Sequence, residues 1–272
     1  MNAPHILTDT NTLARNRKRA DPAALFLQAA AADEIQDRLA MVNRAFTAPV
    51  IVTPFPSIWR NRLPGARLLT SAEHLPLDPA SCDLIVHAMD LHWANDPVGQ
   101  LIQCRRALRP DGLLMVATLG GQTLHELRSC LSQAEVSLAG GLSPRVAPMG
   151  EVRDLGALLQ RAGLALPVAD VMPLRVEYRD LHHLMHDLRA MGETNALTAR
   201  HRLPPPRRLF DRAAALYRDH FPAQGSRILA TFELVFLTGW HPADSQQKPL
   251  RPGSAQHRLA QALGVAETPL SD

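Results

Sequence analysis

The segment that decides the fold is CDLIVHAM at residues 82–89, followed by DPVGQLIQCRRAL at 96–108, RPDG at 109–112 and LLMVATL at 113–119. Residues 82–89 are almost continuously apolar, which is typical of a parallel strand buried on both faces. Asp96 and Pro97 are residue types preferred at a helix start, so we expect a helix at 97–108, a turn at 109–112 and a strand at 113–119. This order of elements predicts an α/β protein with a doubly wound parallel sheet.

The flanking segments continue the same alternation. Before the central segment we expect a helix at 22–44 capped by Asp21 and short strands at 49–52 and 66–70. After it we expect a helix starting at Thr123 with a capping box to Glu126, and a helix at 152–162 closed by Gly163. One or two strands at 164–178 and a long edge-type strand at 229–240 complete the expected elements. Ligands of such sheets bind beyond the carboxyl ends of the strands, so the site is expected in the loops after Val52, Thr70, Met89 and Leu119.

Three segments lie outside this alternation. Residues 1–20 are interpreted as a flexible basic arm, and 21–240 as the α/β domain. Within the domain, residues 180–222 are rich in Arg and His and broken by three prolines at 204–206, which indicates a helical insertion or lid before the last strand. Residues 241–272 are interpreted as a polar tail with one short helix near 256–263.

Composition limits the class of protein. The 272 residues are 46% hydrophobic and 20% charged, as in ordinary folded domains. The net charge is +3, and the excess lies in the arm, so we expect no nucleic-acid partner. Three cysteines without a C-x-x-C pair favour a reducing cytoplasm over a disulfide framework. No apolar run reaches the roughly 20 residues of a membrane span, and we expect no transmembrane segment or secretory signal.

A series of motifs carries a family resemblance. AEHLP at 72–76, CDLIV at 82–86 and LRPDG at 108–112 follow one another with the spacing found in class I S-adenosylmethionine-dependent methyltransferases, which the chain resembles over about 45–178. The resemblance implies a Rossmann-like fold and places the backbone of Ala72 and Glu73 against the adenine of the cofactor. His87, Met89 and Trp93 lie at or after the central strand and are further candidates for cofactor contact, with core packing as the alternative for each.

Further motifs resemble one branch of that superfamily over nearly the whole chain. This branch contains respiratory complex I assembly factor 5 and bacterial proteins often labelled BioC-like. The resemblance implies a protein client, such as a respiratory complex subunit, whose arginine is hydroxylated rather than methylated. The motifs are RNRKRA at 15–20, LHWAND at 91–96, GGQTLHELR at 120–128, GGLSP at 140–144, DLG at 154–156, DLRAMGETN at 187–195 and GW at 239–240.

The segment after the first strand departs from the superfamily pattern. A glycine-rich loop normally follows this strand and lets the backbone approach the cofactor, but VIVTPFPS at 50–57 contains no glycine. Two prolines remove backbone donors, and Phe55 would fill space that the cofactor needs. Only 19 residues separate Val52 from Ala72, so we expect the fold to be truncated near its second strand and S-adenosylmethionine binding to be doubtful.

The remaining candidates are polar residues in the resembling motifs. His92 and Glu126 are the candidates for catalysis, although the capping box would explain Glu126 equally well. For Arg128 a salt bridge to Glu126, Glu193 or Asp187 is the alternative, and His182 and His186 lack a third ligand, so no metal is expected. The candidates for substrate or client contact are Gly120, Gly121, Arg128, Asp187, Arg189, Glu193 and Asn195.

Two functions remain open at this point. The chain is either an enzyme that modifies a protein client, by methylation or arginine hydroxylation, or a non-catalytic assembly chaperone that keeps the methyltransferase fold. We expect a cytoplasmic protein, and the resemblance to the assembly-factor branch adds the inner membrane as a surface beside which it would work. Neither the client nor the oligomeric state follows from the sequence.

Overall fold

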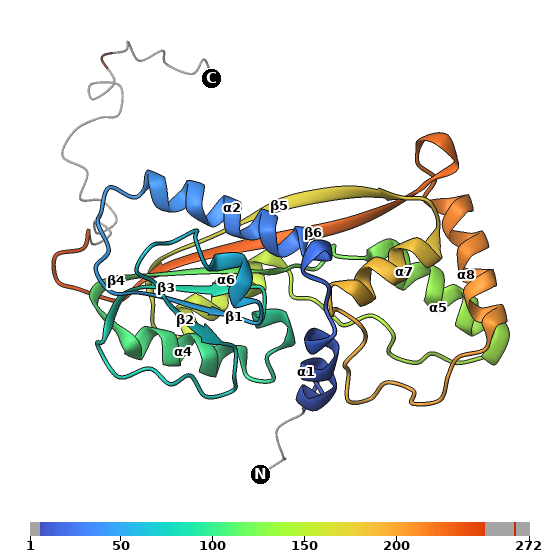
Figure 1. Cartoon of the computed structure of the whole chain (residues 1–272), viewed down its shortest axis with the longest axis horizontal. Helices are drawn as coiled ribbons and strands as arrows, with labels where there is room; N and C mark the ends of the chain where they lie inside the picture. The colour runs from blue at the N-terminus through green and yellow to red at the C-terminus, as the bar shows by residue number, and fades with distance from the viewer. Residues whose placement is uncertain (1–5, 248–263, 265–272) are drawn as a thin grey trace, which may run out of the picture. The chain divides into compact units, whose positions relative to one another are not determined.

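A computed structural model describes residues 6–247 and Gly264 (Figure 1). By its internal contacts the chain divides into one unit at Met1–Pro242 and a second at Ala243–Asp272. Most of the expected tail, including the short helix near 256–263, lies outside the described residues. Within residues 6–247, no helix combines the length and apolar character that a membrane crossing requires.

The first unit is built on a six-stranded sheet in the order β2-β1-β3-β4-β6-β5. The strands β2, β1, β3 and β4 run parallel to one another, whereas β6 is antiparallel to both of its neighbours. Their bounds are β1 Pro49–Thr53, β2 Arg67–Thr70, β3 Cys82–Ala88, β4 Leu108–Leu119, β5 Ala165–Tyr178 and β6 Ile228–Trp240. One strand, β2, lies between β1 and β3 in the chain, as the short spacing in the sequence predicts.

Helices cover both faces of this sheet, because the side chains of its central strand alternate between two cores. Leu84 and Val86 of β3 belong to a core with α2, α5, α7 and α8, whereas Ile85 packs with α4 and α6. The helices are α1 Thr10–Lys18, α2 Phe26–Met41, α3 Pro56–Trp59, α4 Pro97–Ala107, α5 His125–Ala139, α6 Val152–Arg161, α7 Leu181–Ala190 and α8 Arg207–His220, with 3-10 turns at Pro22–Ala24, Leu91–Trp93 and Gln224–Ser226.

The interpretation of residues 1–20 as a flexible arm is wrong for its described part. Asp9 caps α1 through the backbone N–H of Thr12 at 3.0 Å, and Leu13 is buried. Arg17 on the same helix forms an ion pair with Asp90 after β3. The arm is therefore ordered by partners that are distant in the sequence.

Other local expectations also differ from the structure. The helix at 22–44 is divided into a 3-10 turn and α2, and the proposed turn at 109–112 is part of β4, with Asp111 at a positive φ of 61°. The insertion at 180–222 is helical only in α7 and α8. β6 is not an edge strand, because it pairs with both β4 and β5, and β5 forms the edge.

The capping box at Thr123 is likewise wrong. Leu124 adopts φ 53° and its N–H donates to the Thr231 carbonyl of β6 at 2.7 Å, so α5 begins only at His125. The Thr123 hydroxyl accepts from the Glu233 N–H at 3.1 Å instead of capping the helix. Contacts with β6 therefore override the local helix-start pattern.

Candidate functional site

A cavity of about 590 Å³ lies at the carboxyl ends of β1, β2 and β3, where the sequence predicts a site. One wall is a face of α1, including Leu13 and Arg17. Further lining comes from Pro54 after β1, residues 70–74 at the end of β2, and Asp90 and residues 93–96 after β3. Gln100 and Gln103 of α4 complete the lining.

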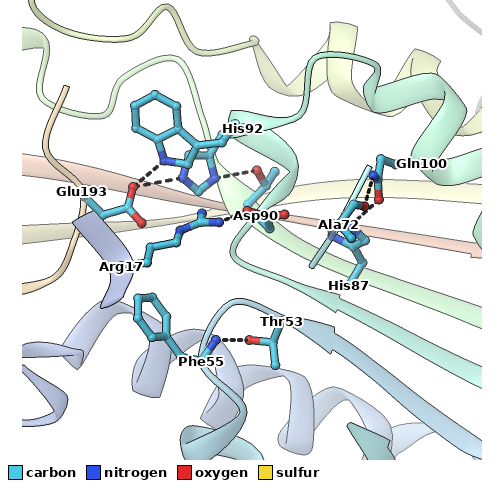
Figure 2. Close-up of polar contacts among 11 residues, drawn as sticks. Arg17, Thr53, Phe55, Ala72, His87, Asp90, His92, Gln100 and Glu193 are labelled. Carbon is cyan, nitrogen blue, oxygen red and sulfur yellow. Dashed lines mark hydrogen bonds and ion pairs between the residues drawn. The ribbon is translucent and has the colours of Figure 1, made fainter. Parts of the chain in front are cut away.

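Beside this cavity lie two largely buried carboxylates, Asp90 and Glu193, which we call the acid site (Figure 2). Asp90 lines the cavity, whereas Glu193 does not. The Arg17 guanidinium pairs with Asp90, and the two side chains are only 11% and 14% exposed. Glu193 Oε2 accepts a hydrogen bond from Trp93 Nε1 at 2.5 Å and lies 3.5 Å from His92 Nε2. His92 Nδ1 lies 3.3 Å from the Thr118 hydroxyl at the end of β4.

Both carboxylates are held in the ionised form. Burial alone would raise the pKa of Asp90, but the charge and hydrogen bond of Arg17 outweigh it and leave that pKa below its usual value. Burial would likewise raise the pKa of Glu193, yet the hydrogen bond and charge of His92 and the charge of Arg17 lower it. The acid site therefore carries two negative charges, and the structure places a guanidinium beside them.

The expected cofactor contacts are only partly brought together. Ala72, Glu73 and Trp93 line the cavity, whereas His87 and Met89 are buried beneath the lining residues. The carbonyls of Ala72 and Glu73 accept hydrogen bonds from Gln100 Nε2 at 2.6 and 3.1 Å. His87 Nε2 lies 3.3 Å from Gln100 Oε1, and complete burial lowers the pKa of His87 and favours its neutral form.

The segment after β1 does not fit S-adenosylmethionine. Pro54 and Pro56 have no backbone N–H, and the N–H of Phe55 donates to the Thr53 hydroxyl at 3.2 Å (Figure 2). Phe55 is only 7% exposed and packs in the interior, whereas its neighbour Pro54 lines the cavity. Free backbone donors, which a glycine loop offers to a nucleoside, are missing at these three positions, although the cavity beside Pro54 is open.

Glu126 and Gly120 contact β6, and Gly121 lies against the N-cap residue of α6. Glu126 is buried and accepts hydrogen bonds from the N–H and hydroxyl of Thr231 at 3.2 and 2.5 Å. Gly120 donates to the Glu233 carbonyl at 2.8 Å, and a Cβ on it would overlap Glu233 and Val235. A Cβ on Gly121 would meet the Glu151 carboxylate. None of the three lines the cavity.

Arg128 lies at a different place from the acid site. It lines a second cavity of about 320 Å³ together with Glu135, Ser143 and Arg145. Its Nη2 donates to the Thr123 carbonyl at 3.4 Å, and the expected salt bridge to Glu126, Glu193 or Asp187 does not form among the described residues. Arg128 and the acid site therefore belong to different cavities and do not form one binding surface.

Of the four polar candidates at 187–195, Glu193 alone is in the acid site. Asp187 accepts a hydrogen bond from the Tyr178 hydroxyl at 2.7 Å, and Asn195 Nδ2 donates to the Pro144 carbonyl at 2.9 Å. Arg189 is exposed on α7. In the part of the chain that the structure describes, no group of three or more His, Cys, Asp or Glu side chains is arranged to hold a metal ion.

Sequence reasoning missed three residues of the site. Asp90 directly follows β3, so its position at the carboxyl end of a central strand was an available signal. Gln100 was hidden within the apolar pattern of α4. Arg17 lies in the motif RNRKRA at 15–20, but nothing local indicates its contact with Asp90, which is 73 residues away.

Comparison with known proteins identifies the relatives of this chain. Residues 33–116 match the family model described as a methyltransferase domain. The protein named arginine-hydroxylase NDUFAF5, mitochondrial, from Danio rerio is 34% identical over 220 residues, which cover 81% of this chain and 68% of that protein. The Homo sapiens protein of the same name is 35% identical over 214 residues, covering 79% of this chain and 62% of that protein.

A bacterial methyltransferase is also similar. The malonyl-[acyl-carrier protein] O-methyltransferase of Laribacter hongkongensis is 37% identical over 188 residues, covering 69% of this chain and 61% of that protein. The chain thus spans less than two thirds of the human and Laribacter relatives. Together with the sheet order, these matches confirm the predicted Rossmann-like fold of class I methyltransferases. The chain belongs to the arginine-hydroxylase NDUFAF5 family, within the class I S-adenosylmethionine-dependent methyltransferase superfamily.

Proposed function

We propose that this chain binds an arginine side chain of a protein client in the acid site and modifies it by hydroxylation, with a respiratory complex subunit as the client. The observation that carries the proposal is the pair of largely buried, ionised carboxylates, Asp90 and Glu193, with the Arg17 guanidinium beside them. The name of the NDUFAF5 relatives supports arginine as the target. We further propose that the protein works in the cytoplasm beside the inner membrane.

The chemistry of the acid site suits arginine better than lysine. A guanidinium stays charged at any physiological pH and offers five N–H donors in a planar fork, which can bind two carboxylates at once. Trp93 and His92 both contact Glu193 Oε2, so they are positioning residues for its carboxylate. His92 remains our candidate for moving a proton.

Hydroxylation places one oxygen atom of dioxygen into a C–H bond of the arginine side chain. The other oxygen atom leaves as water, which requires two electrons and two protons from an external reductant. In this proposal the chain's own residues bind the guanidinium and thereby fix the carbon atoms next to it. Orientation of this kind is a large part of what an enzyme supplies.

The structure also favours a second candidate, a non-catalytic assembly chaperone. Its support is the segment after β1, where Pro54, Phe55 and Pro56 leave no cradle for the cofactor of the superfamily. Such a chaperone would hold the same client arginine without changing it. The two candidates therefore share the binding site and differ in the mass of the product.

Mass spectrometry of the client separates them. The chain is co-expressed with complex I subunits, and arginine-containing peptides of the captured subunits are analysed. We expect one arginine to gain the mass of one oxygen atom, and we expect this gain to be lost with Glu193→Gln and kept with Glu177→Gln, an exposed carboxylate of β5.

The other outcomes are equally clear. Capture of a subunit without a mass change would support the chaperone. A gain of one methyl group would show that S-adenosylmethionine is used and would refute the argument from the segment after β1. Failure to capture any complex I subunit would refute both candidates.

A further inference from the structure

The acid site is already occupied by a side chain of this chain. We propose that Arg17 is an internal competitor, which fills the guanidinium position of the acid site until an arginine of the client replaces it. The inference rests on the proposed function for the identity of the incoming group. In structural terms, the acid site is a formed guanidinium-binding site whose present occupant, Arg17, can be replaced.

Arg17 is placed for this role by the face of α1 that lines the cavity. Thr10, Leu13, Ala14, Arg17 and Lys18 line it together, at the spacing of one helical face. Because Arg17 is itself a lining residue, its guanidinium can leave Asp90 by rotation about the side-chain bonds, with α1 in place. The cavity of about 590 Å³ then offers room for another arginine side chain.

The contact of Arg17 with the acid site is incomplete. Its Nε and Nη2 are buried without a hydrogen-bond partner, and the same is true of Glu193 Oε1, whose side chain is only 8% exposed. Arginine and carboxylates commonly form two parallel hydrogen bonds, but here Nη1 alone reaches Asp90. Arg17 thus leaves donor atoms of its own and an acceptor atom of Glu193 unused, so a guanidinium that reaches Asp90 from the cavity competes with a poorly satisfied occupant.

The backbone of α1 is held by other contacts, so the helix does not depend on Arg17. The N–H of Asp9 donates to the Ala196 carbonyl at 2.8 Å, and Arg200 Nη2 donates to Asp9 and Thr12 at 2.9 and 2.8 Å. Asn16 Nδ2 donates to the Thr194 carbonyl at 3.1 Å. Loss of the Arg17 side chain should therefore leave the helix and the cavity wall in place.

The test removes the competitor and supplies a substitute. The full chain carrying Arg17→Ala is titrated with ethylguanidinium chloride by calorimetry and by thermal unfolding. We expect saturable binding that is at least about tenfold tighter than in the unmodified chain, because an occupant present about nine-tenths of the time weakens apparent affinity by that factor. Ethylammonium chloride, which has the charge without the planar fork, should bind neither protein.

Two matched variants complete the test. Arg15→Ala removes an exposed arginine of the same helix that donates to the Thr12 hydroxyl at 2.8 Å and does not line the cavity, and it should behave as the unmodified chain. Adding Asp90→Asn to Arg17→Ala should abolish the ethylguanidinium response. If Arg17→Ala does not fold, Arg17→Gln keeps most of the side-chain volume and is measured in the same way.

Equal ethylguanidinium affinity of the unmodified chain and the Arg17 variant would overturn the inference, and so would an equal response to ethylammonium. This readout uses no client. Saturable binding by the variant together with an unmodified client would leave the internal competitor standing and refute the hydroxylase. A hydroxylated client, together with equal ethylguanidinium affinities of the unmodified chain and the Arg17 variant, would support the hydroxylase and refute the internal competitor.

Discussion

The Arg17–Asp90 pair allows a quantitative test of how the acid site contributes to stability. Replacing Asp90 by Asn leaves the Arg17 guanidinium buried beside a neutral group. Breaking a buried ion pair typically costs about 3–5 kcal/mol, because the remaining charge is desolvated without compensation. Here the side chains keep 11% and 14% of their exposure, and the charge of Glu193 lowers the penalty for Arg17, so we expect about 2–3 kcal/mol.

The assay is a double-mutant cycle on urea unfolding at neutral pH. The free energy of unfolding is measured for the unmodified chain, Asp90→Asn, Arg17→Met and the double variant. Since Arg17→Met also removes the unpaired buried N–H groups, the double variant should be more stable than the sum of the single losses predicts, by about 1–2 kcal/mol. A coupling below about 0.5 kcal/mol, the range of independent sites, would refute the buried pair.

Three further predictions concern other parts of the fold. Burial tends to raise the pKa of Asp83, but hydrogen bonds from the N–H and hydroxyl of Thr47 and the N–H of Ala48 outweigh it and lower that pKa. Asp83 should therefore stabilise the protein fully above about pH 4, and this contribution should be lost as the pH falls through the folded pKa. When urea midpoints are measured against pH, the midpoint of Asp83→Asn should fall less in acid than that of the unmodified chain. Gly120→Ala should lower the free energy of unfolding by about 1–3 kcal/mol, because the new methyl group would overlap Val235, which is fully buried. Gly121→Ala should be nearly neutral, because the exposed Glu151 that it would meet can move. Chemical denaturation of both variants checks this, and equal losses of unfolding free energy would contradict it. Burial raises the pKa of Cys104 to about 12 and that of Cys130 to about 11, and it also raises the pKa of Cys82. None of the three thiols should therefore react with a disulfide reagent at mildly alkaline pH until urea unfolds the chain. Rapid reaction of a thiol in the folded protein would contradict the structure.

The sheet was predictable because its signals are local. The almost continuously apolar run at 82–88 is β3. The Asp96-Pro97 pair begins α4, where the Gly99 N–H donates to Asp96 Oδ1 at 2.8 Å. The short spacing between Val52 and Ala72 also predicted that the sheet is reduced near its second strand. In each case the residues that decide the element lie within it or next to it.

The failures share the opposite property. Thr123 and Glu126 have the pattern of a capping box, but both bond to β6, more than 100 residues further along the chain. Arg17 was assigned to a flexible arm because its partner Asp90 belongs to another element. The contact between Trp93 and Glu193 spans 100 residues, and it depends on the path of the segment after α7, which no local pattern specifies.

Isothermal titration calorimetry with S-adenosylmethionine tests most directly whether the segment after β1 has lost its cofactor cradle. Because Pro54 and Pro56 have no N–H and the Phe55 N–H is already bonded to the Thr53 hydroxyl, we expect no saturable heat up to millimolar cofactor. A one-to-one isotherm with a micromolar Kd would contradict this and return methyl transfer to first place among the functions of this chain.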